Sequence, residues 1–264
     1  MPLNIIVAAK QVLDPEMPAS AFKVDRDAKK IMPPQGIPPV VNGFDENAVE
    51  AALQLREIHE GKVTVLTMGA EFALDVIKKP LSMGADELIL LQDPAFINTP
   101  DSFFTATVLA AAIKKIGEYD LIICGRQASD WDSSQVSLGI AEMLGLPVIT
   151  LGRKIEVGDG KVLVQRVLTD GYEVMEASLP AVVTVSNEFG EPRYPTLRGI
   201  MQATRKMPTT WTSADLGVEI PAPQLELSDL FVPERDRQCE YIEGSDEAAI
   251  GRNLALKLRE AKLI

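Results

Sequence analysis

Short apolar runs alternate with helical stretches over the first 150 residues of this 264-residue chain. The runs are rich in Val, Ile and Leu and stay apolar at successive positions, which is typical of strands buried on both faces of a parallel sheet. Strands are accordingly predicted at residues 3–10, 62–68, 87–92, 120–125 and 147–151.

Helices are predicted between these strands. Residues 45–59 repeat Ala48, Ala52 and Leu55 at helical spacing, and residues 134–144 form a further helix that ends before Gly145. Thr99-Pro100-Asp101 begins another helix, with Thr as the cap, Pro at the first helical position and an acid near the positive helix end. This alternation predicts a doubly wound α/β domain with a mostly parallel sheet.

The pattern changes after residue 151, where strands follow one another without helices. Residues 154–157 and 161–168 flank Gly158-Asp159-Gly160 and predict a hairpin. Residues 171–177 and 181–186 predict two further strands. We expect these additions to extend the sheet with antiparallel strands or to pack as a flap.

The last part of the chain is predicted to be an arm. Residues 211–240 are rich in loops and proline, and a final amphipathic helix follows, with Ser245 as its expected cap. One stripe of this helix carries Ile250, Leu254, Leu258 and Ala261. We therefore divide the chain into a domain at residues 1–210 and an arm at residues 211–264. The helix is expected to pack on a partner chain or, alternatively, on its own core.

Composition excludes several classes of protein. With 26 Lys and Arg against 38 Asp and Glu, the net charge is −12, which argues against nucleic acid and anionic membranes as partners. One His and two Cys provide no metal cluster and no histidine-based relay. The apolar N-terminal strand lacks the features of a secretory signal, and no apolar run approaches the ~20 residues of a membrane span. We expect a soluble, cytoplasmic protein without membrane insertion.

Candidate chemistry lies just after the strands, because ligands of open parallel sheets bind beyond the strands' carboxyl ends. Small residues at 8–10, 67–70 and 125–130 allow a flat base to approach the backbone. Ser133, Ser134, Gln135 and Val136 precede or begin a helix, where free N–H groups favour a phosphate. The alternative is that Asp132, Ser133 and Ser134 only cap the helix.

Other motifs are absent or weak. The chain has neither G-x-x-x-x-G-K-[ST] nor G-x-G-x-x-G. Asp130 and Asp132 lack a third metal ligand in the sequence, so capping roles are favoured, and Cys124 is expected in the core. These residues predict a nucleotide-sized anionic ligand on an α/β sheet, with no catalytic constellation.

Five segments carry a resemblance to a known family. AAKQVLD (8–14), SMGADE (82–87), GRQASDWDSSQ (125–135), LPAVVTVSNEFGEPRYPTLRGIMQA (179–203) and WTSADLG (211–217) resemble, in order and spacing, the β subunit of electron-transferring flavoproteins. The resemblance implies an adenine nucleotide alpha hydrolase-like fold and a heterodimer with an α subunit that holds most of the FAD. It also implies an electron carrier, not an enzyme, which serves flavin dehydrogenases such as acyl-CoA dehydrogenase.

The resemblance also implies site residues. AMP is expected in the β subunit, with its adenine near Ala8, Asn42, Met68 and Ala128 and its phosphate near Ser133, Ser134, Gln135 and Val136; Gly125, Arg126 and Gln127 complete the loop between them. The partner-docking segment falls on residues 191–206, with Tyr194, Leu197, Ile200 and Met201 as contacts. Leu197 is the expected anchor, after a helix cap at Thr196. Without the resemblance, Leu197 would be expected to pack into its own domain.

Two departures leave the ligand open. Val136-Ser137 replaces the Thr-Gly of many AMP-binding members, and this valine, like Arg126, resembles the electron-bifurcating branch, in which the β subunit binds a second FAD and NADH. Asn42-Gly43, in contrast, replaces the Asn-Pro usual in that branch. A rival of another class is a free-standing adenine-nucleotide sensor, which is a monomer or homodimer and leaves residues 190–264 unexplained.

Overall fold

The computed structural model describes residues 2–96, 99–233 and 239–264. Its contacts divide the chain into two compact units, Met1–Leu230 and Phe231–Ile264, which are described separately here. The segment from residue 211 to residue 230, which the sequence assigned to the arm, belongs to the first of these units.

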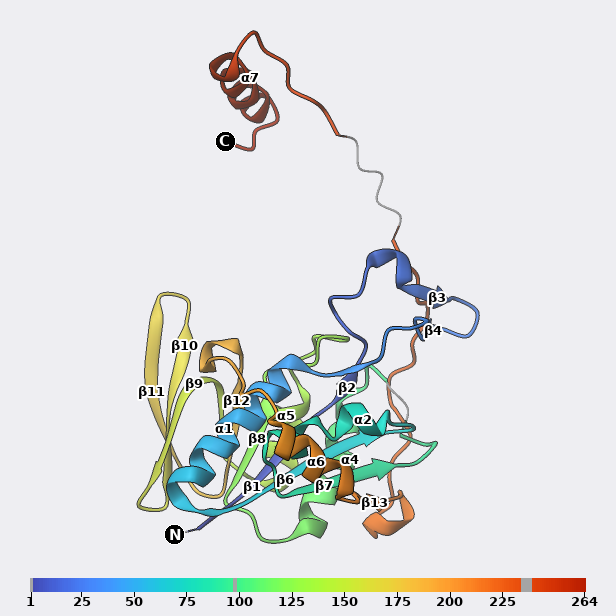
Figure 1. The fold of residues 1–264 in the computed structure, drawn as a ribbon, viewed down its shortest axis with the longest axis vertical. Helices are drawn as coiled ribbons and strands as arrows, with labels where there is room; N and C mark the ends of the chain where they lie inside the picture. Colours follow the sequence, from blue (N-terminus) through green and yellow to red (C-terminus); the bar gives the residue numbers. More distant parts are fainter. Residues whose placement is uncertain (1, 97–98, 234–238) are drawn as a thin grey trace. The chain divides into compact units, whose positions relative to one another are not determined.

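A nine-stranded sheet forms the centre of the first unit in the described residues, with the order β11-β10-β9-β12-β8-β1-β6-β7-β13. The strands are β1 (Leu3–Ala8), β6 (Gly61–Gly69), β7 (Glu87–Gln92), β8 (Leu121–Gly125), β9 (Val148–Gly158), β10 (Lys161–Leu168), β11 (Gly171–Ser178), β12 (Ala181–Val185) and β13 (Thr209–Trp211). Figure 1 shows the β10–β11 hairpin at one edge and β13 at the other. The doubly wound, mostly parallel α/β class is confirmed.

Parallel pairing places the ends of the central strands together. Strand β1 pairs in parallel with both β6 and β8, so that Ala8 lies opposite Leu66 on one side and Cys124 on the other. The carboxyl ends of these three strands therefore lie at one edge of the sheet, where the sequence places its small residues.

Helices cover both faces of the sheet. They are α1 (Gly43–His59), α2 (Leu74–Ile77), α3 (Lys79–Met83), α4 (Ser102–Ile116), α5 (Val136–Leu144) and α6 (Leu197–Arg205). One buried cluster joins α1 and α3 to Ile5 and Val7 of β1, while a second joins α4 and α5 to Ile6. Successive β1 residues thus enter different cores, as expected for a strand buried on both faces.

Two helix starts differ from the prediction. Helix α4 is capped by Asp101, whose side chain accepts a hydrogen bond from the Phe104 N–H at 3.0 Å, and Thr99 lies outside the helix. The expected cap was wrong because Asp101 itself supplies the carboxylate for the helix start. Helix α5 begins at Val136, two residues after the predicted start, because Ser134 has a φ of 54°, outside the helical region.

The strands after β9 are partly as expected. Strands β10 and β11 add to the sheet in antiparallel fashion, whereas β12 is inserted between β8 and β9 and runs parallel to both. The expectation of an antiparallel addition is therefore wrong for β12. All five of its residues are buried, which favours a position inside the sheet, covered on both faces. Strand β13, parallel to β7, was not predicted.

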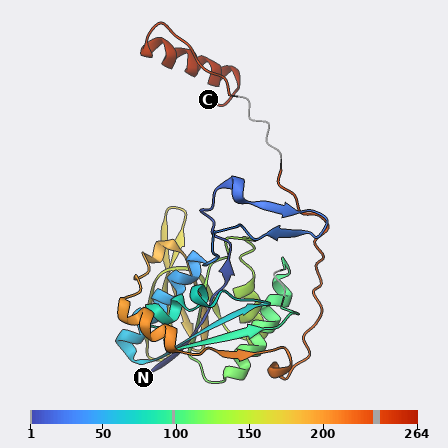
Figure 2. The same ribbon diagram turned by 45° about the vertical axis from the view of Figure 1, so that its right-hand side comes forward.

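Short elements complete the first unit. β2 (Gln11–Val12) pairs with β5 (Val40–Val41), and β3 (Lys23–Asp25) pairs with β4 (Lys30–Met32). The 3₁₀ turns are η1 (Ala19–Ala21), η2 (Asn187–Phe189) and η3 (Ala214–Leu216). The β3–β4 hairpin stands away from the large sheet in both Figure 1 and Figure 2.

The second unit contains the helix α7 (Glu247–Glu260), none of whose residues is buried. Its cap is Asp246, which accepts a hydrogen bond from the Ala249 N–H at 2.7 Å; the expected cap, Ser245, instead bonds to Asp246. Within this unit, Lys257 pairs with Glu240 at 2.6 Å. In the described part of the chain, no helix is long and apolar enough to cross a bilayer.

Candidate functional site

A cavity of about 750 Å³ opens at the carboxyl ends of β1, β6 and β8. Its floor is formed by Ala8, Met68 and Gly125, the residues at or near which these strands end. The volume lies within the usual range of small-molecule sites, ~300–1,000 Å³. The cavity is therefore large enough for a nucleotide and lies where the strand pattern placed it.

The cavity brings together most of the predicted ligand residues. Its wall includes Ala8, Met68, Gly125, Arg126, Gln127, Ala128, Ser133, Ser134, Gln135 and Val136. Asn42 is not in this wall and is fully buried. Its amide donates to the Gln127 carbonyl at 2.8 Å and accepts from the Ser129 N–H at 3.2 Å. Asn42 thus holds the loop whose other side faces the cavity.

The start of helix α5 lies at the cavity wall. The cap residue, Gln135, makes no side-chain cap hydrogen bond. Ser134 instead donates to the Gln127 side chain at 3.0 Å, and Ser133 bonds to Ser102 at 3.1 Å. The alternative of serine capping is thus not observed. The first N–H groups of a helix have no partner within it, and the helix dipole favours an anion there.

A buried carboxylate joins two of the strands that form the cavity floor. Asp45, in the first turn of α1, accepts hydrogen bonds from the backbone N–H groups of Lys10 at 2.8 Å and Gly125 at 3.2 Å. Burial raises the pKa of Asp45 to about 7, although these hydrogen bonds act in the opposite direction. Asp45 fixes the backbone just after β1 to the last residue of β8.

Lys10 and Arg126 are two of the cationic residues that line the cavity. The Lys10 ammonium pairs with Asp130 at 2.7 Å. Arg126 lies over the Phe44 ring at 4.9 Å, and its buried Nε has no hydrogen-bond partner among the described residues. An unsatisfied buried guanidinium N–H is costly, and an anionic ligand oxygen is a strong partner for it.

The outer wall of the cavity comes from two distant segments. Leu225, Leu227 and Leu230 line it, as do residues 29–31 around β4. Asp101 holds the first of these segments by accepting from the Leu225 N–H at 3.0 Å, and Arg26 in the β3–β4 hairpin bonds to Asp229. Figure 2 shows the chain after β13 running past the sheet toward this hairpin.

Sequence reasoning missed the role of Asp45, the pairing of Lys10 with Asp130 and the outer wall. One signal in the sequence could have indicated Asp45. It is a charged residue at the start of a predicted helix, shortly after the candidate ligand residue Asn42. The Lys10–Asp130 pair joins residues 120 positions apart and has no local signature. Cys124 is buried as expected, and burial raises the pKa of its thiol to about 12.

The predicted docking residues gather elsewhere, on and just before α6. Tyr194 is 92% exposed and Leu197 is 82% exposed, and Ile200 and Met201 are also exposed. Thr196 caps the helix as expected and accepts from the Gly199 N–H at 3.0 Å. The alternative in which Leu197 packs into its own domain is contradicted. None of these four apolar residues lines the cavity.

Among residues 2–96, 99–233 and 239–264, no group of three or more His, Cys, Asp or Glu side chains is arranged to hold a metal ion.

The fold and the cavity together define an α/β protein with a nucleotide-sized site at the carboxyl edge of a parallel sheet.

Comparison with known proteins identifies the family to which this α/β protein belongs. The family model of the electron transfer flavoprotein domain matches residues 34–216. The electron transfer flavoprotein subunit beta of Thermoanaerobacterium thermosaccharolyticum is 37% identical over 269 residues, covering 99% of this chain and all of that protein. The chain belongs to the family of electron transfer flavoprotein β subunits.

Two further relatives are similar to this chain over most of its length. The caffeyl-CoA reductase-Etf complex subunit CarD of Acetobacterium woodii is 37% identical over 268 residues, covering 99% of this chain and all of that protein. The electron transfer flavoprotein subunit beta of Megasphaera elsdenii is 41% identical over 211 residues, covering 77% of this chain and 76% of that protein.

Proposed function

We propose that this chain is the β subunit of an electron-transfer flavoprotein heterodimer and that its cavity holds AMP. The heterodimer carries electrons from flavin dehydrogenases of the acyl-CoA dehydrogenase type to a downstream acceptor. The observation that carries this proposal is the uncapped start of α5 at a nucleotide-sized cavity in a chain of this family. The β subunit acts as nucleotide binder and docking surface and is not an enzyme in isolation.

AMP fits the chemistry of the cavity wall. Ala8, Met68 and Ala128 offer small or apolar surfaces for a flat adenine, and the α5 start offers N–H groups for one phosphate. Ser133 and Ser134 add hydroxyls beside that helix start, and no lysine is present among residues 125–137. The phosphate is therefore expected to bind to backbone N–H groups and the helix dipole, and Arg126 is the cation of this segment.

A second candidate ligand is FAD, as in an electron-bifurcating β subunit that also takes NADH. Arg126 favours it, since its unsatisfied Nε suits an additional phosphate, and the cavity continues to Leu13 and Lys29. The relative CarD, named for a caffeyl-CoA reductase-Etf complex, belongs to the same family. AMP carries one phosphate and no flavin, whereas FAD carries two phosphates and a flavin. Chemical analysis of the bound nucleotide therefore distinguishes the two proposals.

The second unit is proposed to bind the α subunit, which holds most of the redox-active FAD. Ile250 and Leu254 are 39% and 45% exposed on α7, and Leu263 and Ile264 are also exposed. A helix with no buried residue gains little stability from its own unit, and burial of this stripe on another chain supplies the missing apolar contact. The oligomeric state of the chain with and without the α subunit therefore tests this proposal.

The experiment is expression of the chain with and without its α subunit, followed by size exclusion with absorbance at flavin wavelengths. A 1:1 heterodimer that carries flavin only when both chains are present supports the proposal. A stable monomer or homodimer that binds ATP and ignores the α subunit supports the nucleotide-sensor rival and contradicts the proposal.

A further inference from the structure

Helix α1 carries a polar stripe that contacts the segment before α6. Asn47, Glu50, Gln54 and Glu57 are spaced by three or four residues and therefore lie on one face of the helix. The Asn47 amide donates to the Gly190 carbonyl at 2.7 Å, and Glu50 and Glu57 both bind Arg193. This stripe holds residues 190–193, the approach to the exposed residues of α6.

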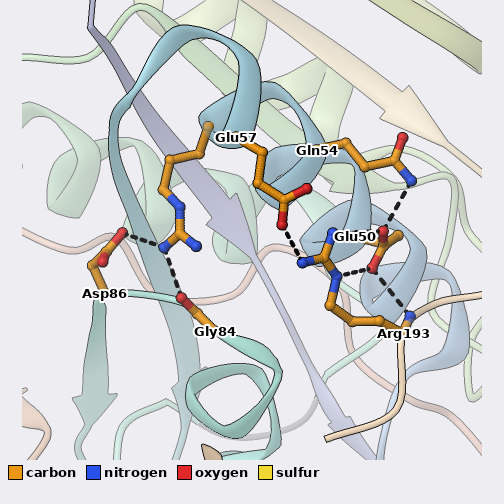
Figure 3. A network of polar contacts seen from close by, with 7 residues as sticks. Glu50, Gln54, Glu57, Gly84, Asp86 and Arg193 are labelled. Carbon is orange, nitrogen blue, oxygen red and sulfur yellow. Dashed lines mark hydrogen bonds and ion pairs between the residues drawn. The ribbon is translucent and has the colours of Figure 1, made fainter. Parts of the chain in front are cut away.

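Arg193 and Glu50 form the centre of this contact (Figure 3). The Glu50 carboxylate accepts from the Arg193 Nε at 2.7 Å, from its Nη2 at 3.0 Å and from its backbone N–H at 3.0 Å. Gln54 adds a fourth hydrogen bond at 2.9 Å. Burial raises the pKa of Glu50, but these hydrogen bonds outweigh burial and hold it below its ordinary value.

The geometry of this pair is specific to arginine. Two guanidinium nitrogens meet the two carboxylate oxygens side by side, and Nη1 of the same side chain reaches Glu57. A lysine ammonium is a point charge and does not reproduce a two-nitrogen fork. Glu50 is only 5% exposed, so an Arg193 side chain that moved away would leave a buried carboxylate without its main partner.

The far end of α6 is also tied to α1. Arg56 donates to the Gly84 carbonyl at 2.7 Å and pairs with Asp86 at 3.0 Å. Gly84 and Asp86 are labelled in Figure 3. Lys206, which ends α6, donates to the Asp86 carbonyl at 2.9 Å. Between the two ends, a Cβ at Gly199 would lie 2.2 Å from the Ser82 carbonyl oxygen, so α6 packs directly on the α3 backbone.

We propose that Arg193, held by Glu50, is a positioning residue that presents Tyr194, Leu197 and Met201 in a preformed arrangement to the partner dehydrogenase. The inference rests on the docking surface proposed for the β subunit, whose predicted position is residues 191–206. Arg193 immediately precedes Tyr194, and Pro192 and Pro195 further limit the backbone of this approach. A segment that is already ordered loses less conformational entropy on binding than a mobile one, which favours association.

The test is Arg193→Lys in the co-expressed heterodimer, assayed with a purified acyl-CoA dehydrogenase that reduces the unmodified heterodimer. The KM for the heterodimer is expected to rise by roughly three- to ten-fold. A ten-fold rise corresponds to a loss of about 1.4 kcal/mol of binding free energy. The kcat, nucleotide content and rate of reduction by dithionite are expected to remain unchanged, whereas the melting temperature is expected to fall, because the buried Glu50 carboxylate loses part of its arginine fork. Arg166→Lys is the matched control, because Arg166 pairs with an exposed glutamate, Glu173, at the hairpin edge of the sheet.

Two further variants separate the possible failures. Leu197→Ala tests the docking role directly, and if it leaves KM unchanged, both that role and the positioning role are overturned. If Leu197→Ala raises KM but Arg193→Lys does not, only the positioning role is overturned. Should Arg193→Lys fail to yield a heterodimer, Glu57→Gln removes only the exposed part of the contact; a smaller rise in KM supports the proposal, and none overturns it.

Discussion

The carboxylate of Asp45 accepts a hydrogen bond from the backbone N–H of Gly125, 80 positions further along the chain, at 3.2 Å. The same side chain accepts from the Lys10 N–H at 2.8 Å, so one buried residue joins the chain after β1 to the end of β8. Because both strands end at the cavity floor, Asp45, which also lines the cavity, holds the backbone of this floor together. Protonation of Asp45 should therefore change the free energy of unfolding.

Asp45→Asn is expected to change how stability depends on pH. The pKa of Asp45 in the folded protein is about 7, above the ordinary value of 3.8, so the folded state binds the extra proton in this interval. The free energy of unfolding of the unmodified protein should then fall, relative to Asp45→Asn, as the pH rises from about 4 to about 7. Urea unfolding at several pH values measures this difference, and parallel profiles for the two proteins would contradict it.

Ser133→Asp is expected to weaken nucleotide retention while leaving the helix intact. A carboxylate beside the α5 start stabilises a helix by about 0.3–1 kcal/mol but competes with a phosphate for the same positive end. Retention should fall roughly ten-fold or more, which is ~1.4 kcal/mol or more.

Ser133→Asn is the matched control, because it has the shape of Asp without the charge. The nucleotide remaining after dialysis is measured for both variants. Equal losses would show that the serine hydroxyl, not the helix start, holds the phosphate. Substitution of Ser134 by proline would not give this information, since its φ of 54° is incompatible with proline whatever the ligand.

Deletion of residues 231–264 is expected to abolish heterodimer formation without unfolding the first unit. The deleted part is a separate compact unit, and its helix α7 has no buried residue. The melting temperature of the truncated chain and its adenine-nucleotide content should stay close to those of the full chain expressed alone. Simultaneous loss of the nucleotide and of the helical circular dichroism of the first unit would mean that residues 231–264 belong to its core.

Leu197→Ala is expected to impair electron transfer from the dehydrogenase and to leave stability almost unchanged. Leu197 is 82% exposed, so its removal costs little within the chain, whereas full burial of a leucine in a partner is worth ~2 kcal/mol. Dehydrogenase-dependent reduction should fall about ten-fold. A drop of several degrees in melting temperature with unchanged kinetics would contradict the docking role.

The sequence predicted the strands and their shared edge well because that information is local. Val, Ile and Leu runs identify doubly buried strands, and parallel strands bring residues such as Ala8 and Gly125 to one edge. The cap of α6 at Thr196 also followed from a local motif. In each case the relevant neighbours lie within one element or its connection.

The remaining features depend on long-range contacts. The position of β12 beside β8 pairs Ala181 with Leu121, 60 positions earlier in the chain, and the order of the strands along the chain did not indicate it. The Arg193–Glu50 pair joins positions 143 residues apart, and the cavity wall takes Leu225 from a loop-rich stretch. Charged and loop residues at such distances carry no periodicity, so only the folded chain brings them together.

In the proposed heterodimer, this β subunit holds AMP in the cavity and the α partner holds the single FAD. The most direct measurement is the identity and amount of nucleotide released from the intact heterodimer by acid or heat, resolved by chromatography. One FAD and one AMP per heterodimer is the predicted result. Two FAD without AMP would contradict the AMP assignment in favour of the bifurcating form, and release of no adenine nucleotide from the β subunit would contradict the site itself.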